Sequence, residues 1–171
     1  MAKKDGAKKR ASQGTPAVLV LQDADVSHTL HPYDHEAPSA GERPNYGLEA
    51  AQALGVPPDQ LFKTLLAQVD GQLAVGVVPV SSSLDLKAFA AAVGGKRAQL
   101  ADPTVAEKTT GYVVGGISPL GQRRRLPTVV DDSALGHPTV YVSAGRRGLQ
   151  VELAPQDLIR LCEATAAAIS A

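Results

Sequence analysis

Two apolar runs separated by Asp70-Gly71 constrain the fold of this chain more than any other feature. Residues 61–69 and 72–80 are both rich in aliphatic and β-branched side chains. An Asp-Gly pair between two such runs favours a two-residue hairpin turn, because both turn positions need positive φ angles that these residues adopt at low cost. We therefore predict a β-hairpin, which places Lys63 on a strand.

Helix and strand signals alternate irregularly along the rest of the chain. We expect helices where a capping residue or a proline precedes an apolar run, and strands where β-branched residues lie between turn signals. The expected helices are 16–21, 46–54, 84–93, a short one from 103 and 155–169, and the expected strands are 27–33, 128–131, 139–143 and 149–153. Hairpin-paired strands without a regular βαβ rhythm predict the α+β class, with a mixed, mostly antiparallel sheet flanked by helices in a single domain.

Length and composition favour one folded domain behind a polar tail. A chain of 171 residues suits a single core. Residues 1–14 are basic and have nothing to bury, so we predict a disordered basic tail at 1–14 and a folded domain at 15–171. No apolar run approaches the ~18 residues of a membrane span, and no signal-peptide core follows the first charges. We expect a cytoplasmic protein that has no membrane partner.

The cysteine and histidine content argues against several kinds of site. Cys162 is the only cysteine, so no internal disulfide and no cysteine-based metal cluster can form. Its apolar, helix-like surroundings favour a buried thiol over a nucleophile. His28, His31 and His35 are expected on a strand and a loop rather than at a helical metal-binding spacing. We predict no metal and no cofactor.

The segment 111–121 is the first candidate for chemistry. Its eleven residues include four glycines and a proline, which exclude a regular helix or a central strand and expose the backbone. Exposed amides suit an ester carbonyl as it becomes an oxyanion, although a structural turn is an equally good interpretation.

Lys63 is the second candidate, because it lies between Phe62 and Thr64 in an otherwise apolar run. Such a lysine either extends to solvent at a sheet edge, which the sequence alone favours, or points into a pocket where its charge is used. No Ser-His-Asp group can be assembled from the sequence, and Ser118 and Ser143 are weak nucleophile candidates.

Two arginine clusters lie beside glycines. Arg123-Arg124-Arg125 follows the glycine-rich segment, and Arg146-Arg147 lies between Gly145 and Gly148. Clusters of this kind suit a polyanion, and each is equally compatible with a solvated surface turn.

Three blocks, 62–66, 111–121 and 141–149, occur in the order found in a known family. They resemble the signature blocks of the YbaK/EbsC deacylases, and the resemblance extends from about Thr15 to the last helix. Segments 31–35 and 101–103 support it. Two departures stand out: the loop 33–47 is longer than usual, and Gln150 stands where some relatives carry an acidic residue.

The resemblance implies an α+β fold related to the editing domain inserted in bacterial prolyl-tRNA synthetases. It implies a trans-editing deacylase that removes cysteine mischarged on tRNA(Pro), by attack of the substrate's own thiol and without a cofactor. The implied partners are the acceptor end of aminoacyl-tRNA and prolyl-tRNA synthetase, and not DNA. The alternatives are a deacylase for another small amino acid such as alanine, or a non-catalytic module that binds tRNA or the synthetase.

The resemblance also implies roles for particular residues. Lys63 is the expected catalytic residue, holding the terminal adenosine, its phosphate or the ester oxygen. The expected substrate contacts are Tyr33, Phe62, Thr64, Gly115, Gly116, Ile117, Ser118, Pro119, Gly121, Ser143 and Gly145.

Overall fold

The structure is a computed structural model that describes residues 14–36, 41 and 44–171. The helices are α2 (Pro16–Asp23), α3 (Tyr46–Leu54), α4 (Leu86–Val93), α5 (Pro103–Thr110), the 3-10 helix η1 (Asp132–Gly136) and α6 (Pro155–Leu161). The strands are β1 (His28–Pro32), β2 (Phe62–Val69), β3 (Gln72–Pro79), β4 (Ala98–Leu100), β5 (Thr128–Asp131), β6 (Val140–Arg146), β7 (Leu149–Leu153) and β8 (Thr165–Ala167).

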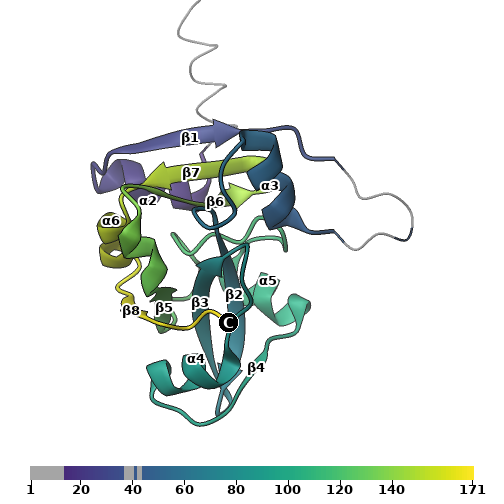
Figure 1. The fold of residues 1–171 in the computed structure, drawn as a ribbon, viewed down its shortest axis with the longest axis vertical. Helices are drawn as coiled ribbons and strands as arrows, with labels where there is room; N and C mark the ends of the chain where they lie inside the picture. The colour runs from purple at the N-terminus through teal and green to yellow at the C-terminus, as the bar shows by residue number, and fades with distance from the viewer. Residues whose placement is uncertain (1–13, 37–40, 42–43) are drawn as a thin grey trace, which may run out of the picture.

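The strands form two sheets within one α+β domain. A three-stranded sheet has the order β1-β7-β6 and is antiparallel throughout, and a five-stranded sheet has the order β4-β2-β3-β5-β8. In the larger sheet β5 runs parallel to β3 and to β8, so this sheet is mixed. A parallel bridge between Leu61 and Tyr141 joins the start of β2 to β6, which brings the two sheets together (Figure 1).

The β2–β3 hairpin forms as predicted. Asp70 and Gly71 make the turn with φ angles of 49° and 84°. Lys63 lies on β2 opposite Val78. The hairpin runs from the junction with the three-stranded sheet to the far end of the molecule (Figure 1).

Apolar side chains from both sheets share the main core. Val142 and Val151 cover one face of the three-stranded sheet, and this face packs with Val75 and Val130 of the larger sheet. Helices α2 and α6 close this core, with Val18 and Leu158 almost fully buried. The opposite face of the three-stranded sheet is therefore left to carry polar side chains.

Most local start and stop signals are confirmed. The Thr15 side chain caps α2 by accepting a hydrogen bond from the Val18 amide. Gly55 ends α3 in the left-handed conformation, and Asp102 caps α5. The predicted tail 1–14 lies, apart from Gly14, outside the described residues.

Two helix predictions were wrong in their bounds. Helix α4 starts at Leu86 with Asp85 as its cap, because the Asp85 carboxylate binds the Ala88 amide, and not at residue 84 after Ser83. The last helix ends at Leu161 rather than near 169, since Glu163 turns with a positive φ of 49° and residues 165–167 pair with β5. No helix in the described part of the chain combines the length and apolar character that a membrane crossing needs.

Candidate active site

A cavity of about 350 Å³ lies beside the first half of β2. It is enclosed by β2, by the start of α3, by the chain from β4 into α5, and by the glycine-rich segment. Its lining residues are Pro44, Asn45, Tyr46, Gly47, Leu61, Phe62, Lys63, Thr64, Leu65, Leu66, Val80, Leu100, Ala101, Pro103, Ala106, Val114, Gly115, Ile117, Ser143 and Gln150. The volume falls at the lower end of the range of small-molecule sites, roughly 300–1,000 Å³.

The edge of β2 that faces this cavity is open. On that side β4 pairs only with residues 67–69, and the Ala101 amide binds the Leu66 carbonyl at 2.9 Å. The Val80 amide binds the Leu61 carbonyl on the β3 side, so the alternation of an antiparallel ladder turns the backbone groups of Phe62 and Thr64 away from β3. Thr64 therefore presents its backbone donor and acceptor at the cavity edge, whereas the backbone of Phe62 lies at the bridge between Leu61 and Tyr141.

Lys63 is the basic side chain among the cavity-lining residues. Burial lowers its pKa below the ordinary value, because a low-dielectric surrounding disfavours the charged form. No ion pair involves Lys63 within the described residues. This lysine lies at a strand edge and also lines a pocket, and the use of its charge there stays a prediction.

Polar groups from the three-stranded sheet reach the same cavity. Ser143 on β6 and Gln150 on β7 are partners in the antiparallel register. The Ser143 hydroxyl accepts a hydrogen bond from the Gly145 amide at 3.2 Å. Gln150 Oε1 and Thr64 Oγ1 are buried and have no hydrogen-bond partner among the described residues. Unpaired buried oxygens are costly, so a bound group that supplies partners is favoured here.

The glycine-rich segment supplies Val114, Gly115 and Ile117 to the cavity wall. Gly115 has a φ of 87°, and a Cβ atom there would lie 2.7 Å from the Tyr46 ring. Glycine is therefore required at this position by both the backbone conformation and the close approach of the aromatic ring.

Arg147 connects the glycine-rich segment to α3. Its Nε donates to the Val114 carbonyl at 2.9 Å, and its guanidinium lies 4.8 Å from the centroid of the Tyr46 ring. The Val114 amide donates to Glu107 at 2.8 Å. Arg147 and Glu107 thus fix the backbone of the cavity wall from two sides.

Of the eleven predicted substrate contacts, five line the cavity and six do not. Phe62, Thr64, Gly115, Ile117 and Ser143 line it together with Lys63. The structure places the others outside the lining: Tyr33, Gly116, Ser118, Pro119, Gly121 and Gly145.

Several of the outlying residues have visible packing roles. The Ser118 hydroxyl is fully buried and accepts from the Leu120 amide at 3.2 Å. The backbone of Gly116 packs on that of Arg146, and the backbone of Gly121 packs on that of Pro16. These contacts explain small or turn-forming residues in this segment without a ligand.

Gly145 and Pro119, two more of the outlying residues, lie in tight contacts of the same region. Gly145 packs against the Tyr112 ring and Thr15. The Pro119 carbonyl accepts from the Cys162 thiol at 3.3 Å. Burial raises the pKa of that thiol to about 12, so Cys162 is the buried, inert cysteine that its surroundings predict.

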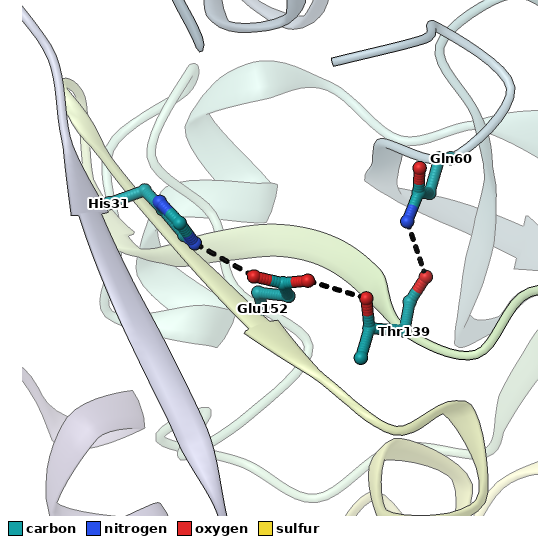
Figure 2. A network of polar contacts seen from close by, with 4 residues as sticks. All are labelled: His31, Gln60, Thr139 and Glu152. Carbon is teal, nitrogen blue, oxygen red and sulfur yellow. Dashed lines mark hydrogen bonds and ion pairs between the residues drawn. The ribbon is translucent and has the colours of Figure 1, made fainter. Parts of the chain in front are cut away.

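A polar network continues from the cavity along the face of the three-stranded sheet. His31 and Thr139 both bind the Glu152 carboxylate, at 2.9 Å and 2.6 Å, and the Gln60 amide donates to the Thr139 carbonyl at 2.9 Å (Figure 2). The Thr139 hydrogen bond, with help from His31, holds the pKa of Glu152 below its ordinary value against the effect of burial. The network ties the segment preceding β2 to the three-stranded sheet.

Other kinds of site find less support in the structure. No group of three or more His, Cys, Asp or Glu side chains in the described part could hold a metal ion.

Tyr46 and Gln150 were not predicted from the sequence as cavity residues. Gln150 had a signal, because it is a polar residue between the apolar Leu149 and Val151 of β7.

Comparison with known proteins connects this geometry to a family. A sequence profile described as the aminoacyl-tRNA editing domain matches residues 46–161. That range includes Lys63 and nearly all of the cavity. The chain belongs to the aminoacyl-tRNA editing domain family.

The relatives include one protein that matches along most of its length and synthetases that match along a small part of theirs. A protein of Enterococcus faecalis named as a Cys-tRNA(Pro)/Cys-tRNA(Cys) deacylase, EbsC, is 34% identical over 91% of this chain and 92% of its own length. A proline–tRNA ligase of Moorella thermoacetica is 37% identical over 43% of this chain, which is 13% of the ligase. The chain is thus similar to the whole of EbsC and to a small part of a synthetase.

A solved structure shares the fold over nearly its full length. It is described as a trans-editing enzyme for prolyl-tRNA synthetase, with a TM-score of 0.71 and 26% identity over 92% of this chain and 98% of that chain. The fold class predicted from the sequence is therefore confirmed, as is the resemblance to the YbaK/EbsC deacylases.

Proposed function

We propose that this protein is a trans-acting deacylase that removes cysteine wrongly attached to tRNA(Pro). The observation that carries the proposal is the half-buried Lys63 ammonium, which makes no ion pair within the described residues and lies at the open edge of β2 in the cavity of an editing domain. A cation in a partly desolvated site stabilises negative charge on an ester oxygen far better than it does in water.

The cavity offers complementary groups for an aminoacyl ester. Lys63 contacts the carbonyl oxygen or the terminal phosphate, and the backbone of Thr64 at the open edge orients the adenosine end. The side chains of Ser143 and Gln150 receive the substrate's amino group, which donates hydrogen bonds. Exclusion of water by Phe62 and Ile117 strengthens each of these contacts.

The reaction that we propose uses the substrate's own nucleophile. The thiol sulfur of cysteine attacks the ester carbonyl carbon, the bond from that carbon to the ribose oxygen breaks, and the thiol proton ends on the departing oxygen. Water then opens the cyclic thiolactone to free cysteine. Holding sulfur and carbonyl in reacting geometry supplies the acceleration, which agrees with the burial of Ser118 and Cys162 away from the cavity lining.

A separate check of this kind is physically reasonable for cysteine and proline. A synthetase pocket separates near-isosteres by only about 1–3 kcal/mol per methylene, so cysteine enters a proline site at an appreciable rate. In the proposed mechanism only an aminoacyl group that carries a thiol reacts in the cavity, and proline has no thiol. We place this activity in the cytoplasm, with prolyl-tRNA synthetase as the partner that supplies selectivity for the tRNA.

The first experiment compares release of cysteine, alanine and proline from their tRNAs, using the wild type, Lys63→Ala and Lys108→Ala. Lys108 is an exposed lysine on α5 outside the cavity lining, which makes it a matched control. We expect release of cysteine only, lost in Lys63→Ala and retained in Lys108→Ala. Release of alanine would favour the alternative of a deacylase for alanine. Binding of tRNA without release of any amino acid would favour a non-catalytic module.

A second experiment tests the attacking group. Cysteinyl-tRNA in which the sulfur is methylated has no nucleophilic thiol but nearly the same size. Under the proposed mechanism its deacylation falls to the uncatalysed rate. Retention of the enzymatic rate would contradict thiol attack and favour hydrolysis by water held near Lys63.

A further inference from the structure

A second hollow lies at the far end of the β2–β3 hairpin. Its volume is about 570 Å³, and it is formed by the hairpin end, the start of α4 and the chain leading through β4. Its lining residues are Gln68, Asp70, Gly71, Leu86, Lys87, Lys96, Arg97, Ala98 and Gln99. We call it the hairpin groove.

The hairpin groove has an excess of available positive charge. Lys87, Lys96 and Arg97 are exposed and make no ion pair within the described residues. The acidic lining residue, Asp70, uses its two carboxylate oxygens to accept hydrogen bonds from the backbone amides of Lys96 and Arg97, at 2.9 Å and 3.0 Å. The cationic side chains therefore remain available to an external anion.

The groove and the cavity are neighbours along one strand. Ala98 and Gln99 of β4 line the groove, while Leu100 and Ala101, which follow directly, line the cavity. On β2, Lys63 and Val69 stand six residues apart, or about 20 Å at the usual rise of a strand. A segment of several nucleotides covers a distance of this order, since duplex DNA carries one phosphate per strand about every 3.4 Å of helix axis.

Three of the five arginines in the two clusters visible in the sequence are engaged by other groups, whereas Arg123 and Arg124 are exposed and make no ion pair in the described part of the chain. Arg147 binds the Val114 carbonyl, and Arg146 Nη1 donates to the Arg147 carbonyl. Arg125 forms an ion pair with Glu163. The charges of the hairpin groove come from two separate segments, Lys87 on α4 and the adjacent pair Lys96-Arg97.

We propose that the hairpin groove binds backbone phosphates of the tRNA acceptor arm whose aminoacylated end occupies the cavity. The identity of the RNA rests on the proposed function, while the anion-binding character rests on the groove itself. Three available cations beside polar Gln68 and Gln99 suit a phosphate chain, which is read by charge rather than by sequence. An RNA leaving the cavity over the exposed Leu100 enters the groove at β4.

The test measures binding of uncharged tRNA by fluorescence anisotropy over a range of salt concentrations. The groove variant is Lys96→Gln with Arg97→Gln, which leaves the two amides that hold Asp70 in place. The matched control is Arg125→Gln with Arg160→Gln, which removes two charges that pair with carboxylates around α6. Circular dichroism and thermal unfolding establish that both variants are folded.

We expect the groove variant to bind tRNA several-fold more weakly and to lower the slope of log K against log salt by about 1.5, since each phosphate contact contributes about 0.7–0.9. The tRNA affinity of the control variant should stay within twofold of that of the wild type. Equal effects of the two variants, or no effect of the groove variant, would overturn the proposal. Unchanged tRNA binding with weaker binding to prolyl-tRNA synthetase would overturn it too, and would assign the groove to a protein.

The two proposals fail in distinguishable ways. Lys63→Ala should abolish deacylation while lowering the salt slope of tRNA binding by no more than one phosphate contact, about 0.7–0.9, which is less than the change expected for the groove variant. The groove variant should lose activity on tRNA but keep full activity on cysteine esterified to adenosine, which is too short to reach the groove. A wild-type protein that binds tRNA with the expected slope but releases no amino acid would contradict the proposed function and leave the groove intact.

Discussion

Thr64 on β2 and Gln150 on β7 belong to different sheets, yet both line one cavity and each has a buried side-chain oxygen that no group in the described part of the chain hydrogen-bonds. Unsatisfied oxygens of this kind lower the stability of the unliganded protein. In the wall of the cavity, both oxygens can accept hydrogen bonds from donor groups of a substrate.

Replacing Gln150 by leucine should separate stability from activity. The change removes an unpaired buried oxygen and keeps a similar volume, so the free energy of unfolding should stay the same or rise by up to about 1 kcal/mol. Deacylation of cysteinyl-tRNA should fall at least tenfold, mainly through KM, because the amino group loses an acceptor. Urea unfolding and steady-state kinetics measure the two effects. A destabilised variant with normal KM would show that Gln150 is a structural residue.

The pH dependence of the deacylation rate should reflect the titration of Lys63. Burial lowers the pKa of Lys63, and the proposed role needs the charged form. Activity should therefore fall as the pH rises through this lowered pKa, at a lower pH than it would for an exposed lysine. The rate must be corrected for uncatalysed ester hydrolysis, which rises over the same range. In Lys63→Arg the residual activity should not show this fall, since arginine stays charged. An identical profile in that variant would assign the titration to another group.

Glycine at position 115 should be essential for the cavity wall. In Gly115→Ala the new Cβ meets the Tyr46 ring, and the φ of 87° is strained for alanine, at a cost of about 1–3 kcal/mol for the backbone alone. Gly136→Ala is the matched control, because nothing lies within 4 Å of its Cβ position and its φ is not in the positive range. We expect loss of activity and of thermal stability in the first variant only. Equal behaviour of the two would contradict the close approach to Tyr46.

Features encoded locally in the chain could be predicted, and features made by distant pairing could not. The Asp70-Gly71 turn and the caps at Thr15 and Asp102 each act within a few residues, and all three are confirmed. Strands β4 and β8 have only three residues each and owe their conformation to pairing with β2 and β5. An alanine-rich segment such as 163–169 has high helix propensity, which this pairing overrides.

The same distinction applies to the site. Lys63 and the segment 111–121 stand out because their composition is unusual for a strand or a helix. Tyr46 looks like an ordinary helical residue in the sequence, and only the approach of Gly115 and Arg147 makes it part of the cavity wall. The hairpin groove is a more extreme case, since its charges come together through the packing of α4 beside β4.

Asp131 should make the free energy of unfolding depend on pH in the acidic range. It is 2% exposed, and its carboxylate binds the amides of Ile169 and Ser170 at 2.9 Å and 3.0 Å, which fastens the end of the chain to β5. Burial alone would raise the pKa of Asp131, but the hydrogen bonds from Ser133, Ile169 and Ser170 together hold it below its ordinary value.

The sign of the pH effect follows from that lowered pKa. The folded state binds the proton of Asp131 less readily than the unfolded state does, so the stabilisation is present at neutral pH and is lost as the pH falls through the folded pKa. In Asp131→Asn the free energy of unfolding at pH 7 should drop by about 1.5–3 kcal/mol, the usual worth of hydrogen bonds to a charged group. The gap between wild type and variant should narrow toward pH 3 in urea titrations. A gap independent of pH would show that the carboxylate acts through its shape and not through its charge.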